Sequence, residues 1–118
     1  MKTVKVRTKI GMEEVAAKCI HGVLAVTSEF SPYRWSVTHI PSGRAFVGCR
    51  KLAVARAVAK SLGETAALAE LTADGNGRAP TAWCEKNRNI VHYIRNMHYA
   101  DTAMTYEEFC AQANELEA

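Results

Sequence analysis

The alternation of apolar and polar positions predicts strands in the first part of the chain. Residues 3–10 alternate Val4 and Val6 with charged neighbours, which is the period-2 pattern of a half-buried strand. The apolar positions of 12–20 recur at helical spacing and predict a short helix, although a strand over 15–20 fits the same residues. The run from 23 to 27 predicts another strand.

A β-hairpin is the clearest local unit. Trp35, Val37 and His39 share one face of a strand, and the residues between them share the other. Pro41-Ser42-Gly43 supplies the turn, and residues 44–48 return as a second strand.

Helical patterns follow the hairpin. Residues 50–62 place their large apolar side chains on one face, and 65–73 predicts a short second helix. A long apolar stripe over 83–97 predicts a helix that begins near Pro80. Thr105, followed three residues later by a glutamate, is a capping-box pattern that predicts the start of a final helix.

These elements predict an α+β fold. We expect a three- to four-stranded antiparallel sheet with a packed helix, followed by a C-terminal helical layer. With 118 residues, of which 48% are hydrophobic, the chain predicts a single domain over 1–118. Its apolar runs are far shorter than the ~18 residues of a membrane span, and no secretion signal is recognisable at residues 1–10. We therefore expect a cytoplasmic protein with no membrane partner.

The net charge of +3 conceals a strong asymmetry along the chain. Residues 1–63 carry 11 Lys and Arg against 3 acids, a net +8, whereas residues 64–118 carry 4 against 9, a net −5. The basic half contains the hairpin and the helix after it, and the acidic half is helical. Such a distribution favours an anionic partner for the first half.

Motifs for catalysis, metals and cofactors are not recognisable in the sequence. The four cysteines have no paired spacing, so we expect buried or half-buried thiols and no metal site; they stand at positions 19, 49, 84 and 110. The chain has no nucleophile elbow and no phosphate-binding glycine loop. We expect neither an enzyme nor a cofactor, and we expect His39 to be a hairpin residue.

The basic residues of the first half predict nucleic-acid binding. A protein that follows a phosphate backbone needs several Lys or Arg side chains within reach of it, because counterion release drives this part of the affinity. The alternative is that the same charges only keep the surface soluble. The expected phosphate contacts are Lys5, Arg7, Lys9, Arg44, Arg50, Lys51, Arg56 and Lys60.

Part of this region resembles a known family. The sequence WSVTHIPSGRAFVGCRKLAVARAVAKSL, residues 35–62, resembles the C-terminal half of double-stranded-RNA-binding domains, in which a hairpin leads into a helix that opens with Lys-Lys-x-Ala-Lys. Arg50 and Lys51 match the first two lysines and Ala53 the alanine, while Val54 replaces the third lysine. The resemblance covers about a quarter of the chain and implies backbone-directed, shape-dependent binding. In overall style the chain also resembles small accessory proteins of phages and mobile elements.

Two other functions fit the sequence. Aromatic and Met side chains are typical of interface cores, and the C-terminal helices provide Trp83, Tyr93, Met97 and Tyr99. They would suit a homodimer, or a protein-interaction module or inhibitor acting on a host protein, although the same residues would serve as the core of the helical layer. A binder of a small phosphate-bearing ligand would use the same arginines as the nucleic-acid binder.

Overall fold

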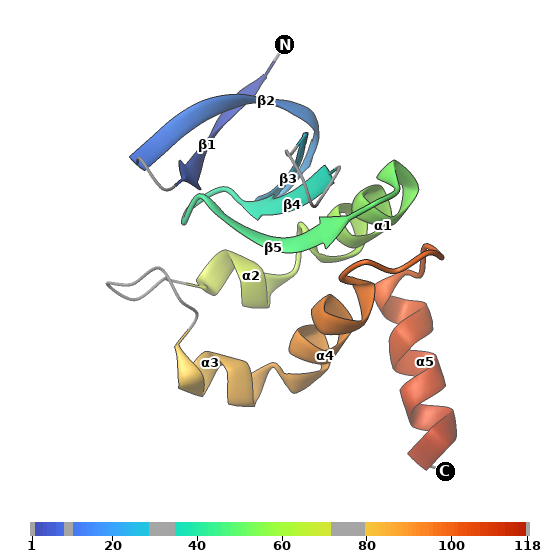
Figure 1. The fold of residues 1–118 in the computed structure, drawn as a ribbon. Coiled ribbons are helices and arrows are strands. Elements are labelled where there is room, and N and C mark those ends of the chain that lie inside the picture. Colours follow the sequence, from blue (N-terminus) through green and yellow to red (C-terminus); the bar gives the residue numbers. More distant parts are fainter. Residues whose placement is uncertain (1, 9–10, 29–34, 72–79, 118) are drawn as a thin grey trace.

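An antiparallel sheet and a set of helices make up the structure, a computed structural model that describes residues 2–8, 11–28, 35–71 and 80–117. The sheet is a five-stranded meander in which each strand pairs with the next, and helices lie below it in Figure 1. The expected α+β class is confirmed, with five strands in place of three or four. The strands are β1 (Thr3–Thr8), β2 (Gly11–His21), β3 (Leu24–Ser28), β4 (Trp35–His39) and β5 (Arg44–Cys49).

The additional strand is β2, and the helix expected over 12–20 was wrong. Val15 and Ala17 are half-buried between exposed neighbours, which is a strand pattern. Backbone pairing runs from Thr3 opposite Ala16 to Thr8 opposite Gly11 on one side, and to β3 on the other. These long-range pairings outweigh the helical spacing of the apolar residues, because strand formation depends on the neighbours that a segment packs against.

Both faces of the central strands are covered. On one face, α1 (Leu52–Leu62) buries Val54 and Val58 in a core shared with Val37 and Val47. On the other face, the strongly curled β1 and β2 bury a smaller cluster around Val4, Val6 and Ala25. The polar side chains of β4 that face this second cluster are therefore buried as well.

A close backbone contact joins the end of α1 to the turn between β2 and β3. The amide of Val23 donates to the carbonyl of Gly63 at 2.9 Å. A Cβ atom on Gly63 would lie 1.9 Å from the carbonyl oxygen of His21, so only glycine fits there. This contact fixes the C-terminal end of α1 on the sheet.

The helical layer differs from the expected pattern at one point. The single helix expected through 83–97 is interrupted at Asn87, whose φ of −118° leaves the helical range. The Asn87 side chain donates to the Trp83 carbonyl at 3.0 Å, as asparagine often does when it competes with helical backbone bonds. The Trp83 indole in turn donates to the Ala67 carbonyl at 2.8 Å. The helices are α2 (Ala66–Glu70), α3 (Thr81–Lys86), α4 (Arg88–Met97) and α5 (Tyr106–Glu117).

The capping box at the start of α5 is confirmed. The Glu108 amide donates to Thr105 Oγ1 at 3.1 Å, and the Thr105 amide donates to Glu108 Oε1 at 3.2 Å. The Tyr106 amide donates to Ser61 Oγ at 3.2 Å, which holds the start of α5 against α1. Among the described residues, no helix combines the length and hydropathy needed to cross a bilayer.

Candidate nucleic-acid interface

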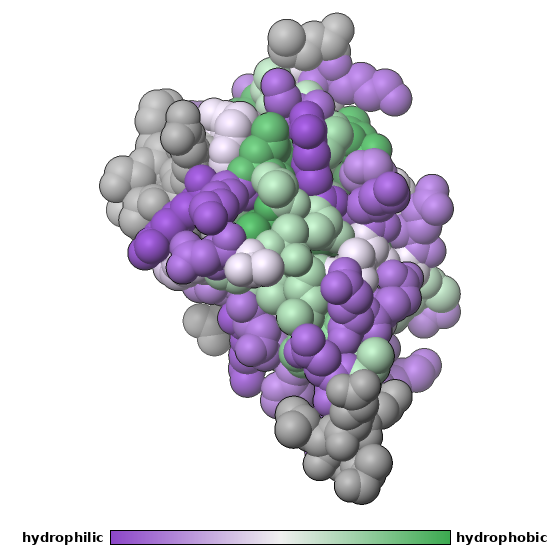
Figure 2. Space-filling model, turned by 90° about the vertical axis from the view of Figure 1, so that its right-hand side faces the viewer, coloured by the Kyte–Doolittle hydropathy of each residue, from purple (hydrophilic) through white to green (hydrophobic). Residues whose placement is uncertain are grey.

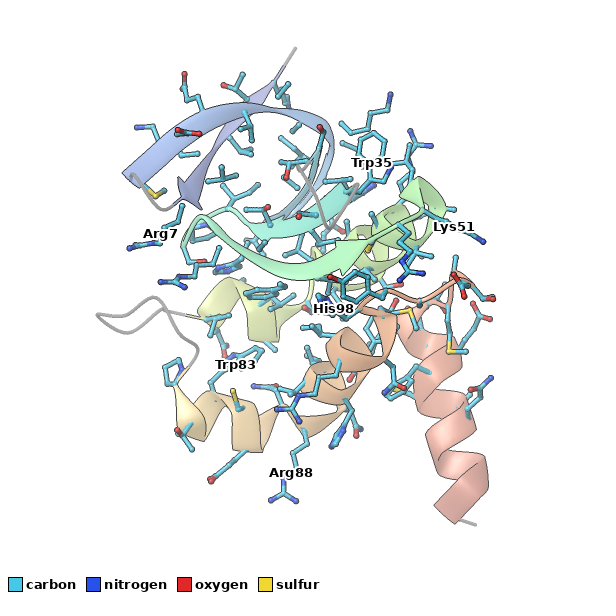
Figure 3. All side chains as sticks on the ribbon, viewed as in Figure 1. Arg7, Trp35, Lys51, Trp83, Arg88 and His98 are labelled. Carbon is cyan, nitrogen blue, oxygen red and sulfur yellow. The ribbon has the colours of Figure 1, made fainter. Side chains whose placement is uncertain are left out.

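The described residues among the expected phosphate contacts fall into two groups and do not form one patch. Arg50 follows Arg44 by six positions of extended chain, a distance of about 20 Å. Figure 3 shows Arg7 and Lys51 at opposite ends of β5. The turn-end cluster comprises Lys5, Arg7 and Arg44; the helix-end cluster comprises Arg50, Lys51, Arg56 and Lys60; and Lys9 lies outside the described residues.

The turn-end cluster is built around the backbone of the β4–β5 turn. The Arg7 amide donates to the Gly43 carbonyl at 2.7 Å, so β1 lies directly against the turn. Gly43 has a φ of +71°, and a Cβ atom there would lie 2.6 Å from the end of Met12 and 3.1 Å from the carbonyl oxygen of Lys5. Lys5 and Arg7 are exposed, whereas Arg44 is half-buried. Close packing therefore dominates this end.

His39 holds the β4–β5 turn against α2. Its Nε2 lies 3.2 Å from the Leu68 carbonyl oxygen, which can only accept, so the ring proton is on Nε2. Its Nδ1 then accepts from the Ser42 hydroxyl at 3.0 Å. The ring stacks on Phe46 with centroids 5.3 Å apart, and burial lowers the pKa of His39. His39 thus joins the hairpin to α2.

The helix-end cluster extends from the residues before α1 to its last turn, where Lys60 lies. Lys51 is the N-cap in an extended conformation, with no side-chain cap, and the first turn carries no acid. Its ammonium donates to the Asp101 carbonyl at 3.0 Å. Arg56 and Lys60 are exposed on the outer face of α1. Within the described ranges, neither Arg56 nor Lys60 has a carboxylate partner.

Two residues from the end of α4 lie against the helix-end cluster. The Gly48 amide donates to His98 Nδ1 at 3.1 Å, and the Tyr99 amide donates to the Gly48 carbonyl at 3.0 Å. The Arg50 guanidinium carbon lies 5.3 Å from the centroid of the Tyr99 ring, a cation–π geometry. Figure 3 shows His98 below the end of β5 that leads to Lys51. Aromatic and basic side chains thus lie together here.

The residues considered for a protein interface are divided between core and surface. Tyr93 is fully buried and Met97 is 5% exposed, so both belong to the core of the helical layer. Trp83 is half-buried and packed on the same core, where its indole bonds to α2. Tyr99 is half-buried at the helix-end cluster. These four side chains do not form a common exposed surface.

All four cysteines are free thiols that are buried or half-buried, and burial raises the pKa of Cys49 to about 11. A hollow of about 290 Å³ lies on the outer side of α3 and α4, where Arg88, His92 and Arg95 line it. Among the described residues, no group of His, Cys, Asp and Glu is arranged to hold a metal ion.

The contact between residues 98–99 and the start of α1 could not be found from sequence. The segments are about 50 residues apart, and no local pattern links them. Tyr99 was grouped with the aromatic residues of the C-terminal helices, and only the bonds to Gly48 associate it with Arg50.

Comparisons with protein-family models, with curated proteins and with solved structures return no match for this chain. Its function is therefore inferred from its own residues.

Proposed function

We propose that this protein is a non-enzymatic nucleic-acid-binding protein that holds phosphates with the helix-end cluster. The observation that carries the proposal is the start of α1, where Arg50 and Lys51 stand at an uncapped helix N-terminus with no acid in the first turn. Arg56 and Lys60 continue the positive charge along the exposed side of the same helix.

The dipole of α1 disfavours the basic residues at its N-terminus. The N-terminus of a helix carries a partial positive charge, so basic side chains there are unfavourable by roughly 0.3–1 kcal/mol each. Two adjacent basic residues at this position cost stability in the free protein. A bound phosphate reverses the sign of the interaction, because the helix N-terminus and both side chains attract it. The position of Lys60 in the last turn has a simpler explanation, since a cation stabilises that end of the helix.

The shape of α1 also suits a polymer. Ala53 is exposed and Ala57 half-buried between the basic positions, so no bulky side chain keeps a backbone away. Figure 2, which views the molecule from the side of α1 and α5, shows mildly hydrophobic surface in the middle and hydrophilic side chains along both flanks. A phosphate backbone could follow such a face.

The resemblance to double-stranded-RNA-binding domains supports contact with phosphates by Arg50 and Lys51, and only that contact is carried over to this chain. It associates Arg50 and Lys51 with the first two lysines of the family motif, and these residues open α1 directly after the β4–β5 hairpin. Binding of this type contacts the backbone and does not depend on base sequence.

Binding measured at two salt concentrations tests the proposal. With four phosphate contacts on a single strand, affinity should fall about 50-fold between 50 and 200 mM salt. In the double variant Arg50→Ala/Lys51→Ala, the slope of log affinity against log salt should decrease by about 1.4. Fluorescence anisotropy with labelled single-stranded and duplex RNA and DNA measures both quantities. The absence of binding at low salt would refute the proposal.

The matched control removes the same charge from another side of the molecule. Arg88→Ala/Arg95→Ala alters the hollow on α4, and Figure 3 shows Arg88 pointing away from the sheet. This variant should bind like the parent protein. If it loses affinity and the helix-end variant does not, the site lies on α4. If a mononucleotide binds as tightly as the strand, the ligand is a small phosphate compound.

A further inference from the structure

Tyr99 differs from the other aromatic residues of the structure. Seven Phe, Trp and Tyr side chains lie in the described part of the chain, and six of them belong to the hydrophobic core or pack against it. Tyr99 is the exception. Its ring lies beside His98, with centroids 4.4 Å apart, and beside the Arg50 guanidinium. Core packing therefore does not explain the ring.

The backbone conformation of Tyr99 is unusual for a residue with a large side chain. Its φ of +61° lies in the left-handed region, and among the described residues other than glycine only Tyr99 has a positive φ. Glycine adopts this conformation without strain, whereas a bulky side chain does so at a cost. Residues held in this way are concentrated at binding and active sites. The sequence retains an aromatic ring where glycine would fit better.

The conformation is held from two directions. The Tyr99 amide is bonded to the Gly48 carbonyl, and the Ala100 amide donates to the Met97 carbonyl at 3.1 Å. His98 is fixed by the bond from the Gly48 amide to its Nδ1, while its side chain remains exposed. Both residues are therefore positioned by bonds to the same glycine, Gly48, near the end of β5. Gly48 precedes Arg50 by two residues and Lys51 by three.

We infer that His98 and Tyr99 form a stacking site for an unpaired base beside the phosphate contact of Arg50, and that the preferred ligand is single-stranded nucleic acid. Aromatic rings and guanidinium planes stack on bases that are not held in a duplex. Lys51 and the start of α1 lie next to this site and would take the adjoining phosphates. The inference rests on the proposed function, because it names the ligand of the same site.

The test combines changes in the protein with a change in the ligand. Tyr99→Gly removes the ring and keeps the left-handed backbone without strain, and Tyr99→Phe keeps the ring. Each protein is titrated with a single-stranded oligonucleotide that carries one 2-aminopurine, whose fluorescence reports stacking, and with the same strand lacking that base. A circular dichroism spectrum checks that each variant folds.

Loss of the ring should weaken binding of the intact strand by about 5- to 150-fold, the range for stacking one base on an aromatic side chain. Tyr99→Phe should bind like the parent protein. The strand without the base should bind more weakly to the parent and equally to both variants. The salt dependence should be the same for all three proteins, because no phosphate contact changes.

The outcomes separate this inference from the proposed function. If no nucleic acid binds at low salt, both are wrong. If nucleic acid binds with the expected salt dependence, but Tyr99→Gly changes neither affinity nor 2-aminopurine fluorescence, the stacking site is refuted and the phosphate site stands. Tighter binding of duplex than of single strand would also refute it. Should Tyr99→Gly fail to fold, the comparison of the two strands on the parent protein still decides whether the base contributes.

Discussion

The two ends of the β4–β5 hairpin carry similar charge and are built differently. At the turn end, Lys5, Arg7 and Arg44 surround a backbone contact in which β1 lies against Gly43. At the helix end, Arg50 and Lys51 are exposed, and the neighbouring aromatic ring of Tyr99 lies outside the core. One end is organised by packing between strands and the other by surface side chains.

This difference shows why a count of charges does not define a binding site. Exposed cations that surround a tightly packed turn have a sufficient explanation in solubility. Cations at a helix N-terminus oppose the helix dipole and need another explanation. We propose that the turn end serves structural stability and the helix end ligand contact, and each of the following predictions examines that division.

The largest effect is expected from Gly43→Ala. Alanine at a φ of +71° is strained, and its Cβ would push aside the flexible end of Met12 and lie 3.1 Å from the carbonyl oxygen of Lys5, a close contact that a small shift relieves. We expect the free energy of unfolding to fall by about 1–2 kcal/mol, mainly from the backbone strain, measured by urea denaturation. The affinity for nucleic acid should not change at a temperature where the variant is folded.

Gly43→Asn separates the two contributions. Asparagine tolerates the left-handed backbone better but has the same Cβ, so it should recover about 1 kcal/mol and keep the close contact with the Lys5 carbonyl oxygen. A Gly43→Ala protein as stable as the parent would show that β1 does not pack on the turn. Loss of binding in a folded Gly43→Ala protein would show that the two ends are coupled.

A smaller effect on the turn end should follow pH through His39. Burial lowers the pKa of His39 below 6.5, so the unfolded chain takes up a proton at a pH where the folded protein does not. Stability should therefore be greatest above pH 6.5 and fall as the pH decreases from 6.5 to the lower pKa of the folded state. Thermal unfolding between pH 8 and 5 measures this change.

The control for this prediction is His39→Gln, which does not titrate and can still donate to the Leu68 carbonyl. Other titratable groups contribute to both proteins, so the difference between their pH profiles isolates His39. The parent protein should lose more stability than the variant on acidification. Parallel profiles would contradict the role assigned to His39.

Local patterns predicted most of the fold. The β4–β5 hairpin, α1 and the capping box at Thr105 and Glu108 all depend on residues close in sequence. The error at β2 had a physical cause, since Val15 and Ala17 become half-buried only because β1 and β3 pair with them. The interruption at Asn87 coincides with a local bond from its side chain to the Trp83 carbonyl, which the helical spacing of the apolar residues does not reveal.

The candidate site was predictable only in part. The sequence identifies Arg50 and Lys51 as basic residues before a helix, and the turn-end residues appear equivalent to them in any count of charge. What distinguishes the helix end is Tyr99, about fifty residues away, whose left-handed backbone is held by bonds to Gly48 and within residues 97–100. Such contacts arise from the tertiary fold and leave no pattern in the sequence.

The smallest effect is expected from Lys5→Ala/Arg7→Ala. The two ends of β5 are about 20 Å apart, more than twice the screening length of about 8 Å at physiological salt. A strand of about six nucleotides bound at the helix end should therefore lose less than about twofold in affinity. The fold should be unaffected, because the Arg7 amide that bonds to Gly43 belongs to the backbone.

Anisotropy with this short strand, compared with Arg50→Ala/Lys51→Ala, measures the difference in affinity between the two double variants. Equal losses in the two double variants would show that both ends form one binding surface and would remove the distinction between them.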